Sequence, residues 1–255
     1  MKILAIGDII GSPGRTYLKE NLANIKKEFN IDFIIANGEN SSGGLGMNPK
    51  SFNELLDAGV NAITLGNHTW RKKDILKIID DSRVIRPINY LEGTAGRGYR
   101  IFNFNNKKIL IINAVGRVYM EPVNNPFVAV RNAINELSSK ADIIIVDFHA
   151  EATSEKIAMG YLLDGKVNLV FGTHTHVQTA DDTILPKGTA YITDVGMTGP
   201  KESIIGCEKS IIITSFLTEI PEKKVVAGGD VQFNGVVIDI DDESNKTTSI
   251  FRINK

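Results

Sequence analysis

The chain contains only four histidines, and each of them lies at or just after the end of a predicted strand. They are His68 after "AITLGN", His149 at the end of "ADIIIVDFH", and His174 and His176 at the end of "VNLVFGTHTH". Imidazole serves both as a metal ligand and as a proton donor near neutral pH. Alternate side chains of an extended segment point the same way, so His174 and His176 should converge on one point. This pair suggests a metal site.

Carboxylate and amide side chains occupy the same kind of position. Asp8 ends "ILAIGD", Glu39 and Asn40 end "FIIANGEN", and Asn67 precedes the first histidine. In open α/β sheets, ligands bind outside the carboxyl ends of the strands. Each residue alone has an ordinary structural explanation, such as a loop hydrogen bond, a helix cap or a turn. One metal site at a shared sheet edge explains all of them together.

The donor set indicates the metal and the reaction. Imidazole, carboxylate and amide oxygen suit iron, manganese or zinc, and the single cysteine, Cys207, lies outside these motifs. The donors exceed what one ion needs. They suit two ions about 3.5–4 Å apart that share a carboxylate, which is an arrangement used for phosphoester hydrolysis.

The composition restricts the classes of protein that this chain can belong to. Its 29 Lys and Arg residues balance 30 Asp and Glu residues, and this near neutrality argues against a protein that binds long nucleic acid. One cysteine suggests a reducing compartment. No apolar run approaches the roughly 18 residues of a membrane helix, and Asp8 interrupts the apolar N-terminus too early for a signal peptide. We expect a cytoplasmic protein that does not enter the membrane.

The pattern of elements predicts an α/β fold. Short apolar strands alternate with helices expected over residues 15–29, 49–59 and 72–81, which favours parallel strands. Two antiparallel hairpins are expected, one turning at Asn105 and Asn106 and one near residues 242–245. No linker or repeat divides the chain, so we expect one domain over residues 1–255 with two mixed sheets between helix layers.

Five short motifs then resemble the ordered blocks of calcineurin-like metallophosphoesterases: "GDIIG", "NGEN", "GNH", "DFHAE" and "GTHTH". The superfamily usually reads D-x-H, G-D, G-N-H, H and G-H-x-H. This chain has Ile10 in place of the first histidine and Glu39-Asn40 in place of Gly-Asp. Those departures are similar to the YmdB-type bacterial 2′,3′-cyclic-nucleotide 2′-phosphodiesterases, and the likeness also covers "RPINY", "VGRVYM" and the region from Gly172 to Pro200.

The resemblance implies a four-layer α-β-β-α sandwich of mixed sheets and two ions per chain. It implies iron, with manganese or zinc as alternatives. One ion would be held by Asp8, Asn40 and His176, and the other by Asn67, His149 and His174. Glu39 would bridge the two ions, and a metal-bridged hydroxide would attack the phosphorus.

His68 would donate a proton to the leaving ribose oxygen, and the product would be a 3′-nucleotide. The expected partner is a small cyclic nucleotide. RNA ends, other phosphoesters, a regulatory metal-binding role with little turnover, and a homo-oligomer stay open as alternatives.

Other residues allow two interpretations each. Arg117 could contact a phosphate or pair with a structural carboxylate, and Trp70 could stack on a base or pack in the core. Residues 41–47, "SSGGLGM", could form a lip over the site or a plain connection. Arg71 stands where the resemblance suggests an acidic residue, and Cys207 is expected to act as a small hydrophobic residue.

Overall fold

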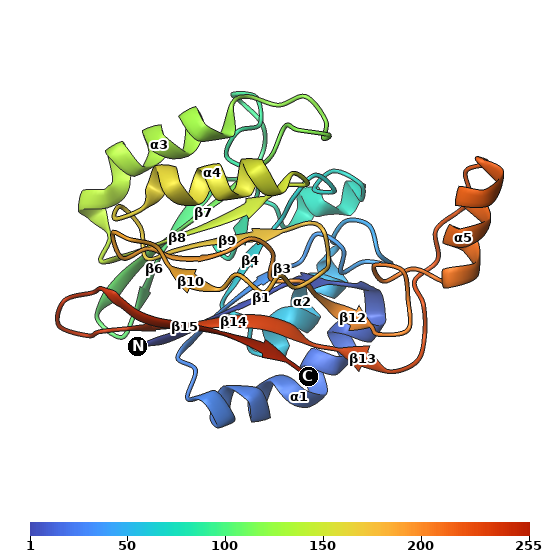
Figure 1. Ribbon diagram of the computed structural model, residues 1–255, viewed down its shortest axis with the longest axis horizontal. Helices are drawn as coiled ribbons and strands as arrows, with labels where there is room; N and C mark the ends of the chain where they lie inside the picture. The colour runs from blue at the N-terminus through green and yellow to red at the C-terminus, as the bar shows by residue number, and fades with distance from the viewer.

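The computed structural model describes all 255 residues and contains two six-stranded sheets with helices on both outer faces (Figure 1). The first sheet runs, from edge to edge, β15 (Thr247–Asn254), β14 (Asn234–Ile240), β1 (Lys2–Ile6), β3 (Phe33–Asn37), β4 (Ala62–Thr64) and β5 (Val84–Ile85). The second runs β10 (Thr183–Ile184), β11 (Ala190–Ile192), β9 (Leu169–Thr173), β8 (Ile143–His149), β7 (Lys107–Val115) and β6 (Tyr99–Phe104).

Five α-helices and a small third sheet complete the fold. The helices are α1 (Gly11–Phe29), α2 (Pro49–Asp57), α3 (Pro126–Leu137), α4 (Thr153–Leu163) and α5 (Lys209–Thr218), with 3-10 helices η1 (Lys73–Lys77) and η2 (Ser138–Lys140). The third sheet joins β13 (Val231–Gln232), β12 (Met197–Pro200) and β2 (Asp8–Ile9). No helix combines the length and the apolar character that crossing a bilayer requires.

The expected four-layer sandwich is confirmed by how the strands divide their side chains. Along β1, Ile3 and Ala5 point into the core between the two sheets, whereas Leu4 and Ile6 point toward the helices. This alternation follows from the two-residue period of a strand. Both faces of the central strands are buried, so these strands are continuous apolar runs.

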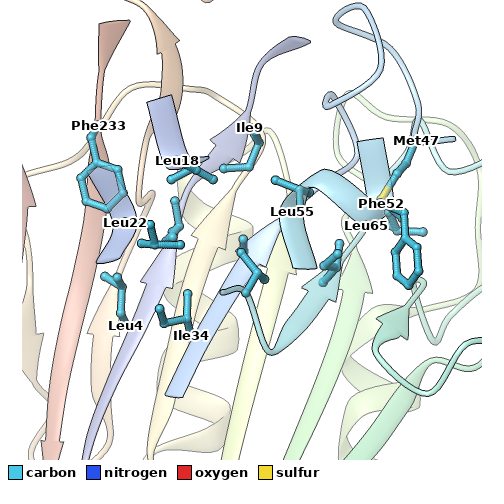
Figure 2. Close-up of a cluster of buried hydrophobic side chains, with 14 of the residues drawn as sticks. Leu4, Ile9, Leu18, Leu22, Ile34, Met47, Phe52, Leu55, Leu65 and Phe233 are labelled. Atoms are coloured by element: carbon cyan, nitrogen blue, oxygen red, sulfur yellow. The ribbon is translucent and has the colours of Figure 1, made fainter. Parts of the chain in front are cut away.

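The helices cover the sheets through apolar stripes. Leu18, Leu22 and Ile25 of α1 are spaced by four and three residues, so they share one helix face. Figure 2 shows Leu18 and Leu22 beside Leu4 and Ile34 of the first sheet. Each such side chain contributes roughly 1.5–3 kcal/mol when it is fully buried. On the opposite side of the molecule, α3 and α4 cover the second sheet in the same way.

Strand directions match the sequence pattern. The pairs β1–β3, β3–β4, β7–β8 and β8–β9 are parallel, and their carboxyl ends therefore lie along one edge of the molecule. Both predicted hairpins are present. β6 turns into β7 at Asn105 and Asn106, which have φ of 46° and 59°, and β14 turns into β15 across residues 241–246.

Two predicted helices have different bounds in the structure. The first begins at Gly11 rather than Arg15, because Gly11 adopts φ of 56° and turns the chain directly from β2 into α1. The segment 72–81 contains only the 3-10 helix η1. The backbone N–H groups of Ile75, Ile78 and Asp81 each donate to the carbonyl three residues earlier, so the segment forms tight turns rather than a regular α-helix.

Candidate metal centre

The predicted site residues come from five strand ends that meet at one edge of the two sheets. Asp8 lies in the short strand β2. The loops after β3, β4 and β9 carry the other residues, and His149 is the last residue of β8. The residues that follow these three strands are Glu39, Asn40, Asn67, His68, His174 and His176.

One group of donors surrounds His149. Its Nε2 lies 3.1 Å from Glu39 Oε1, 2.9 Å from Asn67 Oδ1 and 3.1 Å from His174 Nδ1. Glu39, His149 and His174 each offer one ligand atom, and these three atoms lie within 4.8 Å of one another. Such convergence of nitrogen and oxygen donors is the geometry of a metal-binding cluster.

A second group adjoins the first and is centred on Asn40. Its Nδ2 lies 3.3 Å from Asp8 Oδ1, 3.1 Å from His176 Nε2 and 3.5 Å from Glu39 Oε1. His176 Nε2 is also 3.6 Å from Asp8 Oδ1. The same oxygen of Glu39 therefore borders both groups, and the two sets of side chains share one carboxylate.

His68 lies beside this shared carboxylate. Its Nδ1 is 2.7 Å from Asn40 Oδ1 and 3.2 Å from Glu39 Oε1, and its backbone N–H donates to Glu39 Oε2 over 2.8 Å. These contacts fix the ring through Nδ1. His68 also lines the cavity that opens over the donors.

The loop that carries His174 and His176 corrects one expectation. The segment is not extended, because His174 has φ of 104° and His176 has φ of 64°. Each histidine consequently enters a different group, His174 beside His149 and His176 beside Asp8. The loop is held by Asp8 Oδ2, which accepts the backbone N–H of His174 over 3.0 Å.

A buried ion pair holds the same loop through a backbone hydrogen bond. Lys156 Nζ on α4 lies 2.6 Å from Asp194 Oδ2, and the two side chains are 1% and 0% exposed. Asp194 Oδ2 also accepts the backbone N–H of Thr175, the residue between the two histidines, over 3.1 Å. The pair was not predicted, because a lysine on a helix and a distant aspartate carry no shared sequence signal.

His149 is oriented from behind by buried hydroxyl and carboxyl groups. Thr173 Oγ1 lies 2.9 Å from His149 Nδ1 and donates to Asp147 Oδ1 over 2.8 Å. Burial raises the pKa of Asp147 to about 6. Contacts of this kind at Nδ1 orient the ring so that Nε2 can bind a metal.

The ionisable side chains of the cluster shift one another's pKa values. Burial disfavours the charged ring of His149, but Glu39, Asp8 and Asp147 together favour it and raise the pKa of His149 to about 9. Burial and the neighbouring His149 lower the pKa of His174 to about 3. Burial works against ionisation of Asp8 and Glu39, yet the facing histidines hold the pKa of each carboxyl below its usual value.

The space among these donors is kept free of other atoms by a glycine. A Cβ on Gly66 would lie 2.4 Å from both Glu39 Oε2 and His149 Nε2, so no larger residue fits there. Buried carboxylates that face imidazole and amide donors, with no side chain between them, form a donor set that fits divalent cations. The cluster therefore fits the metal ions that the sequence pattern predicts.

A cavity of 360 Å³ opens over the cluster. Its polar side is formed by Glu39, Asn40, His68, His174 and His176, together with Glu151 and Lys224. Glu151 Oε2 lies 3.1 Å from His174 Nε2, a contact that the motif "DFHAE" could have suggested. Cys207 also lines the cavity, although it lies far from the histidine motifs in the sequence.

Three other residues and one segment were singled out from the sequence, and only the segment lines the cavity. Arg117 does not line the cavity, and its backbone N–H donates to the buried carboxylate of Glu155. Trp70 is 39% exposed and packs on Tyr90 with ring centroids 5.9 Å apart. Arg71 pairs with an exposed glutamate on another loop. From the glycine-rich segment 41–47, Gly43, Gly44 and Leu45 form one wall of the cavity.

Comparison with known proteins agrees with the fold and the motifs. The chain is 48% identical over 254 residues to the 2′,3′-cyclic-nucleotide 2′-phosphodiesterase of Bacillus subtilis, covering 99% of this chain and 96% of that protein. A crystal structure of a hypothetical protein from Thermus thermophilus superposes with a TM-score of 0.95 at 39% identity, covering 100% of this chain and 99% of the other.

A second solved structure, described as a novel phosphatase from Mycoplasma pneumoniae, also has a TM-score of 0.95, at 41% identity. It covers 100% of this chain and 93% of the other. A sequence profile of the YmdB-like protein family matches residues 4–253. With nearly every residue inside that match and the fold shared along the whole chain, this protein belongs to the YmdB-like family and has the metallophosphoesterase fold.

Proposed function

We propose that this protein hydrolyses 2′,3′-cyclic nucleotides to 3′-nucleotides with two bound metal ions and His68 as the proton donor. The observation that carries the proposal is the position of Glu39 Oε1, which borders both donor groups while the ring of His68 lies 3.2 Å away. The 48% identity to a 2′,3′-cyclic-nucleotide 2′-phosphodiesterase supports the choice of substrate.

The ligands that we propose follow the two groups of donors. Asp8, Asn40 and His176 would hold one ion, and Asn67, His149 and His174 the other, with Glu39 contacting both. Bound ions of this kind neutralise phosphoryl oxygens and lower the pKa of a bound water. We propose iron first, with manganese and zinc as alternatives, because imidazole, carboxylate and amide donors suit all three.

The contacts of His68 favour a proton on its Nδ1. Asn40 Oδ1 lies 2.7 Å from Nδ1 and Glu39 Oε1 lies 3.2 Å from it, and both oxygens accept hydrogen bonds. With one proton held on Nδ1, the protonated ring carries its second proton on Nε2. That second proton would go to the leaving oxygen, and His68 would return to the neutral imidazole.

His68 would protonate the ribose 2′ oxygen as its bond to phosphorus breaks. An alkoxide is a poor leaving group, so a positioned proton donor contributes roughly 10²–10⁴-fold to the rate. The remaining bond to the 3′ oxygen would stay intact, and the product would be a 3′-nucleotide. Pairing with Glu39 and Asn40 holds the ring at a fixed place beside both donor groups.

The experiment is product analysis with 2′,3′-cyclic AMP and the iron- or manganese-loaded protein. Chromatography should identify 3′-AMP, and elemental analysis should find two ions per chain. An RNA fragment that ends in a 2′,3′-cyclic phosphate is tested in parallel. Accumulation of 2′-AMP, or no hydrolysis by protein with both ions bound, would contradict the proposal.

The role of His68 is tested with His68→Ala. We expect unchanged metal content and a loss of roughly a hundredfold or more with 2′,3′-cyclic AMP. A p-nitrophenyl phosphodiester should lose far less, because its leaving group departs without a proton. Equal losses on both substrates would refute a role in protonating the leaving group.

The single cysteine also leads us to propose a reducing, cytoplasmic location. Cell fractionation followed by immunodetection tests it.

A further inference from the structure

Three exposed apolar side chains line the same cavity as the histidines. Leu45, Ile205 and Val225 line it and are 39%, 46% and 47% exposed. Single exposed apolar residues are ordinary on a protein surface, but several that line one cavity mark a ligand surface. We call these three residues the apolar shelf.

The shelf is attached to the proposed metal centre. The carbonyl oxygen of Ile205 accepts a hydrogen bond from His176 Nδ1 over 2.9 Å. Ile205 therefore lies one hydrogen bond away from a proposed metal ligand. A molecule whose phosphate lies at the histidines would reach the shelf with its next group.

The backbone at Ile205 is strained. Its φ is 47°, a left-handed conformation that is rare for a β-branched residue, and the following Gly206 has φ of 95°. Asparagine or glycine would adopt this conformation more easily. Strained residues of this kind concentrate at functional sites. An apolar side chain at such a position, half exposed in a cavity, indicates a binding role rather than a folding role.

The chain segments that carry the shelf residues contact one another. The bridge between Cys207 and Val226 holds the segment of Val225 beside that of Ile205. Val226 Cγ2 lies 2.9 Å from where a Cβ on Gly44 would be, so this segment also touches the loop that carries Leu45. The shelf is thus built from three chain segments that contact each other at the mouth of the cavity.

We propose that the apolar shelf holds the nucleobase of the cyclic nucleotide, an inference that rests on the proposed function. The cavity is lined by polar side chains that suit a cyclic phosphate and by apolar side chains that suit a flat ring, and these match the two parts of a nucleotide. Its volume of 360 Å³ lies in the range of about 300–1,000 Å³ that is typical of small-molecule sites.

The chemistry of the shelf predicts weak discrimination among bases. None of its three side chains can form a hydrogen bond with the edge of a base, and every base offers a flat face of similar kind. We expect kcat/KM for the four 2′,3′-cyclic nucleotides to agree within about tenfold, because apolar pockets reject similar groups weakly.

The test compares 2′,3′-cyclic AMP with glycerol 1,2-cyclic phosphate, which has the same five-membered cyclic phosphate and no base. Val225→Ser should lower the ratio of kcat/KM for the nucleotide to that for the base-free ring by roughly tenfold. Val128→Ser is the matched control, because Val128 is 42% exposed on α3 and does not line the cavity. It should keep the wild-type ratio.

A second variant separates binding from folding. Ile205→Asn keeps the backbone carbonyl that faces His176 and suits the left-handed conformation, so the melting temperature should stay equal or rise. The same variant should raise KM for 2′,3′-cyclic AMP. If the ratio of kcat/KM for the nucleotide to that for the base-free ring is unchanged in both Val225→Ser and Ile205→Asn, the shelf does not bind the base. The proposed function would stand in that case, because hydrolysis itself would persist. Failure of the wild type to hydrolyse either compound would overturn the proposed function together with the shelf.

Discussion

Removal of the cation from the buried pair of Lys156 and Asp194 should destabilise the protein strongly. The charged atoms lie 2.6 Å apart, and both side chains are buried. Lys156→Met would leave a buried carboxylate whose remaining partners include the backbone N–H groups of Thr175 and Gly196. Breaking such a pair from one side costs about 3–5 kcal/mol. For a chain of this length, that corresponds to a fall in melting temperature of roughly 6–20 °C.

The same substitution should weaken metal binding, because Asp194 holds the loop between His174 and His176 through the N–H of Thr175. Stability is measured by urea and thermal unfolding of protein stripped of metal, and metal affinity is measured by titration calorimetry. The exposed pair of Lys77 and Asp74, 2.7 Å apart, supplies the control Lys77→Met, which should barely change either quantity.

A double variant, Lys156→Met with Asp194→Asn, removes both charges. It should recover much of the lost stability, because the buried charge without a partner is the main cost. Two results would refute this reasoning. One is a loss below about 1 kcal/mol in Lys156→Met, and the other is a double variant that is less stable than both single variants.

Three further predictions concern the donor cluster itself. Gly66→Ala places a methyl group 2.4 Å from Glu39 Oε2 and His149 Nε2, so it should abolish high-affinity metal binding in a calorimetric titration; an unchanged affinity would contradict the geometry. Asn40→Ala removes both a proposed oxygen ligand and the acceptor at His68 Nδ1, so elemental analysis should find fewer than two ions per chain and kcat should fall; two ions with full kcat would contradict both roles. In the metal-free protein, burial opposes the charge on His149 but Glu39 and two nearby aspartates raise its pKa to about 9. That attraction stabilises the fold fully below about pH 6.5, and the stabilisation is lost as the pH rises through about 9, so urea midpoints should fall over that range.

Local patterns in the sequence predicted two sheets between helix layers and a site at the ends of the strands. Alternation along β1 and the helical spacing of Leu18, Leu22 and Ile25 follow from local periodicity, and Asn105 and Asn106 mark a turn that their tolerance of positive φ permits. The histidines, carboxylates and amides end strands whose parallel order brings their carboxyl ends to one edge. Such signals lie within a few residues of one another, so they can be read without coordinates.

The resemblance implied how those donors divide into two groups, but the loop conformation that separates them and the buried groups that support it follow from the tertiary structure. His174 and His176 enter different groups because positive φ turns their loop out of the strand direction, and that turn is imposed by Asp8 and by Asp194 with its partner Lys156. The apolar shelf likewise unites segments far apart in the chain. Contacts of this kind depend on which strands become neighbours across two stacked sheets. No local pattern encodes them, because the attraction between two distant side chains exists only after the fold has brought them together.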